Sequence, residues 1–114
     1  MGALLVFVGG GVGAVLRYGV GKLLPGAVAT MAVNIIGCFL MGILAAWLMG
    51  REQGESWRLL LGVGLLGGFT TFSAFALDFA DLWRFQPATA LSYAAMSVLA
   101  SVAALFMGMW VGRP

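Results

Sequence analysis

The stretch GGFTTFSAF at residues 67–75 lies midway through a charge-free apolar run, residues 59–77, that is just long enough to cross a bilayer. It nevertheless contains two adjacent glycines, two threonines and a serine, which disfavour a continuous helix. Irregular backbone persists at membrane depth only where protein or a water-filled path satisfies its polar groups. The sequence therefore predicts a span that is broken around Gly67 and Gly68, and such a break indicates a functional site.

The composition of the whole chain is that of a membrane protein. Of its 114 residues 62% are apolar and only 9% are charged, and the mean hydropathy is +1.06. This length fits a single all-α domain, residues 1–114, with four transmembrane helices joined by short turns. The net charge is +2 and the basic residues form no cluster in the sequence, so nothing indicates binding to nucleic acid. With no histidine and one cysteine, the residue sets of most metal and catalytic sites are missing, and we expect no enzyme.

Four apolar segments, residues 3–24, 27–49, 57–83 and 87–112, are the predicted spans. An even number of spans places both termini and the loop after the second span on one side of the membrane. That side carries three basic residues and the other side two or three, so the positive-inside rule selects no orientation. A chain that inserts both ways can form an antiparallel homodimer, and inverted repeats of this kind build many transport folds.

Two polar positions inside the first two spans each allow two interpretations. Arg17 either snorkels to the interface or places a cation at the mouth of an anion path. Thr30 and Asn34 are four residues apart and therefore share one face of a helix. A membrane asparagine either pairs with a neighbouring helix or lines a polar path, because an unpaired amide is costly in lipid.

The fourth span carries a polar stripe and a ladder of small residues on different faces. Thr89 is followed at intervals of four by Tyr93, Ser97 and Ser101, so four hydroxyls follow one face of an apolar helix. A single hydroxyl in such a helix usually bonds to its own backbone, but a row of four indicates a polar track.

Glycines in the first span match a loose dinucleotide fingerprint. No strand or acidic partner accompanies it, and close helix packing explains those glycines better.

Three motifs together give the chain a family resemblance. GGGVGAVLRY at residues 9–18 is similar to the first-span pattern GGxxGAxxRY of the Fluc family of small dual-topology fluoride channels. ATMAVNIIGCFLMG at residues 29–42 resembles that family's GTLxVNxxGxFxxG, with Ala29 where glycine is usual. GGFTTFSAF resembles GGxTTFSTF, with Ala74 where threonine is usual. The resemblance covers the whole chain, and its second and third motifs are highly specific.

The resemblance implies roles for the broken span and its neighbour. Gly67 and Thr70 match the residues whose backbone carbonyls hold a structural sodium ion at the dimer centre, and carbonyl oxygens suit a hard cation. Phe72 and Phe75 match two rings whose edges face fluoride, and the edge of an aromatic ring is its positive part. Asn34 matches the residue whose amide donates to the ion beside those rings. The departure at Ala74 removes one hydroxyl next to them.

The resemblance also implies the rest of the fluoride pathway. Tyr93, Ser97 and Ser101 match the hydroxyl track of the fourth span, Arg17 matches the arginine near the vestibule, and Thr30 shares the helical face of the pathway residue Asn34. Fluoride holds water strongly, so a path must replace its hydration with hydrogen-bond donors that bind without trapping the ion. Amide and hydroxyl groups meet this need without a full positive charge.

The function that follows is passive export of fluoride from the cytoplasm through two pores of an antiparallel dimer in the bacterial plasma membrane. Two other membrane functions remain as alternatives. A proton-coupled exporter like the small multidrug resistance proteins needs a titratable group at mid-membrane, whereas all four acidic residues here lie at or near span ends. A four-helix assembly protein without transport activity would have no need for the predicted break in the third span. Fluoride, lipid and a second copy are the expected partners.

Overall fold

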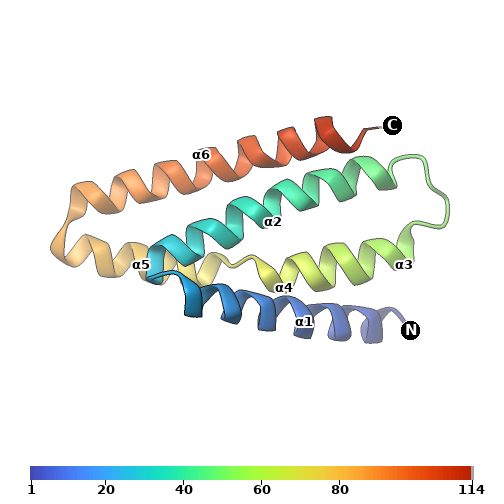
Figure 1. The fold of residues 1–114 in the computed structure, drawn as a ribbon, viewed down its shortest axis with the longest axis horizontal. Helices are drawn as coiled ribbons and strands as arrows, with labels where there is room; N and C mark the ends of the chain where they lie inside the picture. Colours follow the sequence, from blue (N-terminus) through green and yellow to red (C-terminus); the bar gives the residue numbers. More distant parts are fainter. Residues whose placement is uncertain (114) are drawn as a thin grey trace.

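The computed structural model describes residues 1–113 and is an elongated bundle of helices (Figure 1). Three of its helices are long and continuous, α1 (Gly2–Leu23), α2 (Gly26–Leu48) and α6 (Pro87–Gly112). Between α2 and α6 the chain forms a third helical segment, Glu55–Phe85, which is assembled from shorter pieces. All four segments are long and apolar enough to cross a membrane. The chain is a multi-pass membrane protein, as the sequence predicts.

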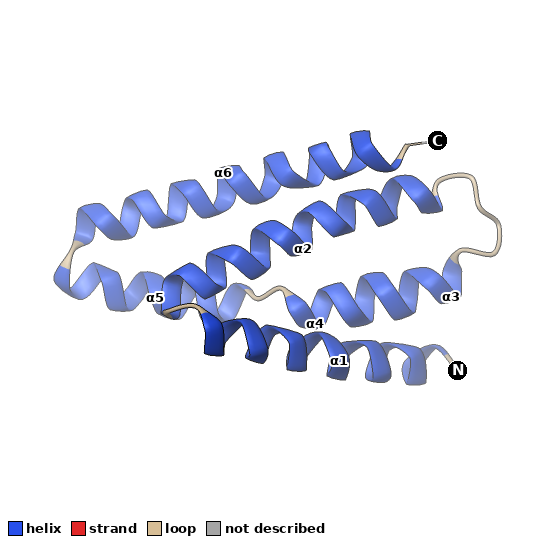
Figure 2. Ribbon diagram, viewed as in Figure 1, coloured by secondary structure: helices blue, strands red, loops and turns tan. Residues whose placement is uncertain are grey.

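The third segment changes its helical type and is then interrupted by a short loop before α5 (Figure 2). It begins with α3 (Glu55–Trp57), continues as the π-helix η1 (Arg58–Leu66) and the single turn α4 (Gly67–Phe69), and resumes as α5 (Phe72–Phe85). The two residues between α4 and α5 are extended, with φ −85° and ψ 158° at Thr70 and φ −152° and ψ 126° at Thr71. The glycines at 67 and 68 are themselves helical, so the sequence placed the irregular backbone three residues too early.

The connections between the helices are short and use residues that suit turns. Leu24 and Pro25 are extended between α1 and α2, and Pro87 occupies the first turn of α6, where its missing N–H costs nothing. Gly50 has a φ of +79°, a conformation that glycine adopts without strain, and it ends α2 in the loop at residues 49–54. Both chain ends and this loop lie at one end of the bundle (Figure 1), in agreement with four spans.

Two helix pairs form the bundle, and glycine allows the helices of each pair to approach closely. In α1, a Cβ at Gly13 would collide with the backbone carbonyl of Leu65 in η1. In the pair α2 and α6, a Cβ at Gly42 would collide with the carbonyl of Leu105, and one at Gly108 with the carbonyl of Phe39. Gly13, Gly42 and Gly108 are therefore packing residues, as expected of small residues at membrane helix interfaces.

The polar side chains that are buried lie on the facing sides of α2 and α6. Thr30 on α2 is 8% exposed, and Tyr93 and Ser97 on α6 are 6% and 4% exposed. The extended residues and the start of α5 pack beside the same two helices. The bundle therefore gathers hydroxyl, amide and aromatic groups between α2, α5 and α6, and this region contains the candidate site.

Candidate functional site

Asn34 joins α2 to the irregular backbone of the third segment. Its Nδ2 donates to the carbonyl oxygen of Thr71 at 3.0 Å, and its Oδ1 accepts from the Thr71 N–H at 2.8 Å. One amide therefore satisfies both backbone groups of a residue that has left the helix, which is the condition for extended backbone inside a membrane protein. The second hydrogen on Nδ2 remains available as a donor. Asn34 therefore pairs with a neighbouring segment, and it also lines a cavity.

The start of α5 is capped by the side chain of Thr71. Its Oγ1 accepts from the N–H of Ala74 at 3.1 Å and lies 3.3 Å from the Oγ of Ser73. Threonine is a good N-cap because its oxygen replaces a missing helical acceptor. The neighbouring hydroxyl of Thr70 points back along the chain and donates to the carbonyl of Leu66 at 3.0 Å.

These bonds free two backbone carbonyls from their usual helical donors. In a continuous helix the carbonyl of Gly67 would accept from Thr71 N–H and that of Thr70 from Ala74 N–H. Here the first N–H donates to Asn34 and the second to the Thr71 side chain. Gly67 and Thr70 are the two residues that the family resemblance assigns to cation binding, and their oxygens are among those without a helical donor at this junction.

A cavity of about 270 Å³ opens beside this junction, and we name it the inner cavity. Five of the predicted pathway residues line it from α2, α5 and α6, namely Asn34, Phe72, Phe75, Ser97 and Ser101. Cys38, Thr70, Thr71, Val98 and Val102 complete its wall. Within the described part of the chain its lining contains no charged side chain.

The two phenylalanines of the inner cavity lie close together at the start of α5. Their ring centroids are 5.5 Å apart with an angle of 56° between the ring planes. Phe75 is half-buried and packs against Tyr93 with centroids 5.3 Å apart, whereas Phe72 is 77% exposed. Tilted rings of this kind present edges as well as faces to their surroundings, and the edges carry the positive part of the quadrupole.

The serines of α6 bring hydroxyls to the inner cavity that bond to nothing else in residues 1–113. The Oγ atoms of Ser97 and Ser101 are both buried and have no hydrogen-bond partner. A buried hydroxyl without a partner costs about 1–3 kcal/mol, so native structures seldom leave one unused. Two such groups in one cavity are therefore available to a ligand that accepts hydrogen bonds.

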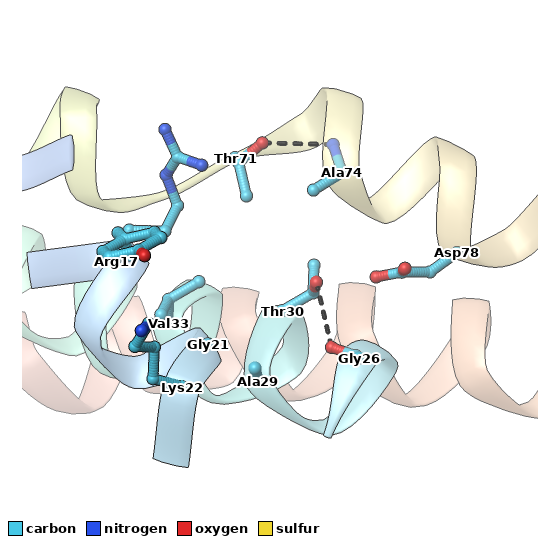
Figure 3. A pocket seen from close by; sticks show the side chains of 11 residues that line it. Arg17, Gly21, Lys22, Gly26, Ala29, Thr30, Val33, Thr71, Ala74 and Asp78 are labelled. Carbon is cyan, nitrogen blue, oxygen red and sulfur yellow. Dashed lines mark hydrogen bonds between the residues drawn. The ribbon is translucent and has the colours of Figure 1, made fainter. Parts of the chain in front are cut away.

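A second cavity of about 370 Å³, which we name the outer cavity, lies between the ends of α1 and α2 and the side of α5 (Figure 3). Arg17, Lys22, Thr30 and Asp78 line it, and Thr71 contributes to both cavities. Arg17 donates from Nε to the carbonyl of Gly68 at 3.1 Å. The arginine thus contacts the third segment and also reaches a cavity wall.

Thr30 and Tyr93 occupy the region between the cavities. Thr30 is buried, lines the outer cavity and donates to the carbonyl of Gly26 at 3.4 Å (Figure 3). The ring of Tyr93 packs on Phe75 of the inner cavity, and its hydroxyl donates to Oδ2 of Asp78 in the outer cavity at 3.3 Å. Thr89, the first residue of the hydroxyl stripe, instead bonds to Gln86 at the exposed start of α6.

Asp78 is a site residue that the sequence analysis missed, because an acid near the end of a span suggests a solvated interface. The signal was its position three residues after Phe75, which places both on one face of α5. Cys38 was likewise overlooked, although it follows Thr30 and Asn34 at intervals of four. Residues that lie one helical turn before or after a predicted pathway residue should therefore also be considered as pathway residues.

The family model described as "CrcB-like protein, Camphor Resistance (CrcB)" matches residues 4–109. The chain belongs to the CrcB-like family. It is also 51% identical to a protein of Novosphingobium aromaticivorans named "Fluoride-specific ion channel FluC", over 95% of this chain and 93% of that one. Proteins of the same name from Caulobacter vibrioides and Mesorhizobium japonicum are 50% and 48% identical over 96% of the chain and 94% of each relative.

The family membership confirms the resemblance drawn from the three motifs. All eight residues predicted for the pathway of this CrcB-like chain lie along one side of the bundle between α1, α2, α5 and α6, either in the walls of the two cavities or, for Tyr93, between them. The two cavities differ sharply in charge. The outer one contains both signs and the inner one, among the residues described, contains only neutral groups.

Proposed function

We propose that this protein is a channel that lets fluoride leave the cytoplasm passively and thereby limits fluoride toxicity. The observation that carries the proposal is the inner cavity, where an amide, two hydroxyls without partners and two phenylalanine rings meet. A strongly hydrated anion enters such a space only if donors replace its water. The names of the relatives, which specify fluoride, agree with this chemistry.

Neutral donors suit conduction better than a fixed charge would. Asn34 offers its second amide hydrogen, and Ser97 and Ser101 offer hydroxyl hydrogens along α6. The rings of Phe72 and Phe75 add positive edges to the same cavity. Each contact is weak enough to be left again, whereas a cation buried beside the ion would hold it.

The outer cavity is the proposed entrance to this path. Arg17 and Lys22 place two positive charges around it and raise the local concentration of anions. Fluoride then passes Thr30 and the Tyr93 hydroxyl, which bridge the entrance and the inner cavity. Asp78 opposes the anion by its charge, so its bond to Tyr93 shapes the passage and moderates the attraction of the cations.

We also propose that the third segment is broken at mid-membrane. Its extended residues, Thr70 and Thr71, fall near the centre of the 31-residue segment Glu55–Phe85. The bonds from Asn34 and the cap at Ala74 are the means by which such a break keeps its backbone groups paired. The break gives the ion a path that a continuous helix would fill.

The working unit that we propose is an antiparallel homodimer with two symmetry-related pores. The near-even distribution of basic residues supports insertion in both orientations. The exposed ring of Phe72, which lies at a cavity wall rather than on the outer surface of a helix pair, supports a second copy covering that wall. Two inverted copies would bring the same residues to each path in opposite directions.

A structural sodium ion at the centre of the dimer fits the carbonyls of Gly67 and Thr70. Both oxygens have lost their helical donors, and two copies would supply four of them. Such oxygens suit a hard cation of single charge. When bound, the ion would hold the two broken segments together, while the chain's own residues would carry the anion.

Fluoride efflux from liposomes tests the proposed function. Purified protein is reconstituted into liposomes loaded with potassium fluoride, and a fluoride electrode follows release after valinomycin is added. We expect rapid release that does not depend on a pH gradient. Release no faster than from empty liposomes would overturn the proposal. Release that needs an inward proton gradient would favour a coupled exporter instead, and normal assembly without release would favour a structural protein.

Labelling of the C-terminus tests the antiparallel dimer. A cysteine added at the C-terminus of a Cys38→Ser background is exposed to a membrane-impermeant maleimide in intact cells and after lysis. We expect about half of the chains to be labelled from outside, since an antiparallel pair places one C-terminus on each side. Labelling only after lysis, or complete labelling from outside, would show a single orientation and would contradict the antiparallel arrangement.

A further inference from the structure

Cys38 lies in line with the polar groups of α2 that face the cavities. Thr30, Asn34 and Cys38 follow one another at intervals of four and share one helical face. On α6, Tyr93, Ser97 and Ser101 have the same spacing. The two helices pack along their length and run in the same direction (Figure 1), so both rows follow one path.

The close contacts between the helices fix how the two rows are aligned. Gly42 of α2 packs on the backbone of Leu105, and Gly108 of α6 packs on Phe39. Cys38 and Ser101 both line the inner cavity, together with Asn34 and Phe72. The thiol is half-buried, which distinguishes it from a cysteine sealed inside a helix interface.

An independent observation points to a ligand in this cavity. The hydroxyl of Ser97, a residue only 4% exposed, lines the same cavity and has no hydrogen-bond partner within the described chain. The buried hydroxyl of Ser101 is in the same condition. The space beside Cys38 therefore contains unused donors and is not a packing defect between apolar side chains.

We propose that Cys38 is a modification site for small, neutral, thiol-reactive electrophiles, and that an adduct there closes the ion path. The inference rests on the proposed function for its effect on transport, but the reaction of the thiol is independent of it. Fluoride has to pass through the space that the adduct would enter, and a path for one small anion has little room to spare. The adduct also replaces the thiol hydrogen with an apolar methylthio group, so the side chain can no longer donate a hydrogen bond.

Methyl methanethiosulfonate is a suitable probe because it is small, uncharged and able to cross membranes. The thiolate of Cys38 attacks its sulfenyl sulfur, so a new S–S bond forms and the S–SO₂ bond breaks. Methanesulfinate leaves with the bonding electrons, and the thiol proton passes to the buffer. Dithiothreitol reverses the reaction by thiol–disulfide exchange, becoming oxidised as the Cys38 thiol is regenerated.

The experiment compares adduct formation with fluoride release in the same proteoliposomes. The sequence contains a single cysteine, so the mass of the intact chain reports directly on Cys38. We expect the mass of one methylthio group on each chain and a loss of flux of at least about tenfold, with both reversed by dithiothreitol. The Cys38→Ser variant, compared with its own untreated flux, should gain no mass and lose no flux.

A matched control places the thiol at a similar depth on another face. Leu99 on α6 is 70% exposed and does not line the inner cavity. In the Cys38→Ser background, Leu99→Cys should gain the same adduct without losing flux. A complete adduct on Cys38 that leaves flux unchanged would overturn the inference. So would the absence of any adduct on Cys38 under conditions that fully modify the thiol introduced by Leu99→Cys.

The two proposals fail in different ways in this design. Untreated protein that releases no fluoride would contradict the channel function alone. The accessibility of the thiol would then still be decided by mass. Fluoride itself provides a further readout, because an ion in the inner cavity should slow the modification of Cys38 more than an equal concentration of chloride does. Equal rates in the two salts would show that the thiol lies outside the ion path and would overturn the closure mechanism.

Discussion

The two cavities of this CrcB-like protein differ in the charge of the side chains that line them. The outer cavity contains Arg17, Lys22 and Asp78, so long-range charge operates where water is still present. Along the wall of the inner cavity within residues 1–113, only amide, hydroxyl, thiol and apolar groups occur. In the first region attraction is broad and weak, and in the second each contact is short-ranged and directional. Under the proposed function, charge in the outer cavity would collect the anion and neutral donors in the inner cavity would carry it.

The largest effect should come from the rings of the inner cavity. Phe72→Ile and Phe75→Ile keep apolar bulk but remove the positive ring edge, and we expect fluoride flux to fall roughly 100-fold or more, equal to about 2.7 kcal/mol on the barrier. Liposome efflux measures this loss, and size-exclusion chromatography checks that assembly is unchanged. The control Phe106→Ile changes an exposed ring of α6 outside the cavity and should retain flux. Wild-type flux in both cavity variants would refute the role of the rings.

Removal of the Asn34 amide should have the next largest effect, and it should alter stability as well as flux. Asn34→Ala leaves the N–H and the carbonyl of Thr71 without their partners. We expect a loss of about 1–3 kcal/mol in stability and a fall in flux on the order of 30-fold. Thermal unfolding in detergent and liposome efflux provide the two readouts.

Ser73→Ala is the matched control for Asn34→Ala. It removes only the exposed contact with the Thr71 hydroxyl and should change the unfolding temperature little. If Asn34→Ala unfolded at the same temperature as the wild type, the amide would not be what holds the irregular backbone.

The outer cavity should give smaller effects that depend on salt. Arg17→Gln removes a charge from the proposed entrance, and we expect flux to fall about fivefold at low ionic strength, equivalent to about 1 kcal/mol. The difference from wild type should shrink as an inert salt screens the entrance. Arg17→Lys keeps the charge and should retain most of the flux. A fivefold loss that stayed constant from low to high salt would indicate a structural role for the bond to Gly68.

The smallest effect expected is a gain. Asp78→Asn removes the negative charge of the outer cavity but keeps an oxygen that can accept from Tyr93. Flux should rise by less than about threefold, because a single partly hydrated charge contributes about 0.6 kcal/mol or less here. Efflux at low ionic strength measures the change. A strong loss of flux would mean that the carboxylate is required for the position of Tyr93. It would contradict the proposal that the charges of the outer cavity act only on the attraction of the anion.

The parts of the fold set by composition and periodicity could be predicted from the sequence. The apolar runs specified four spans, and the glycines indicated close helix packing without naming the partner helices, because both signals are local. The grouping of Asn34 with Phe72, Ser97 and Ser101 followed from the family resemblance and is present in the inner cavity. The four-residue spacing alone predicted the row of polar residues on α2 and the row on α6. It could not predict that these two rows face one another.

The details that the sequence did not reveal depend on contacts between distant segments. The irregular backbone falls at Thr70 and Thr71 because Asn34, 37 residues away from Thr71, supplies its hydrogen bonds. Glycine content alone favoured Gly67 and Gly68, which remain helical. The π-helix η1 has no signal that we recognised, and Asp78 joined the site only because α5 turns its face toward Tyr93.

The reversal potential in a planar bilayer tests the central claim most directly. With a tenfold gradient of fluoride, equal pH on both sides and the remaining anion replaced by gluconate, a passive fluoride-selective path should reverse at about 59 mV, the value for one charge and one decade of concentration. The potential should stay there when the pH of one side is changed by one unit. A reversal potential that follows the proton gradient, or the absence of any fluoride current, would contradict the account.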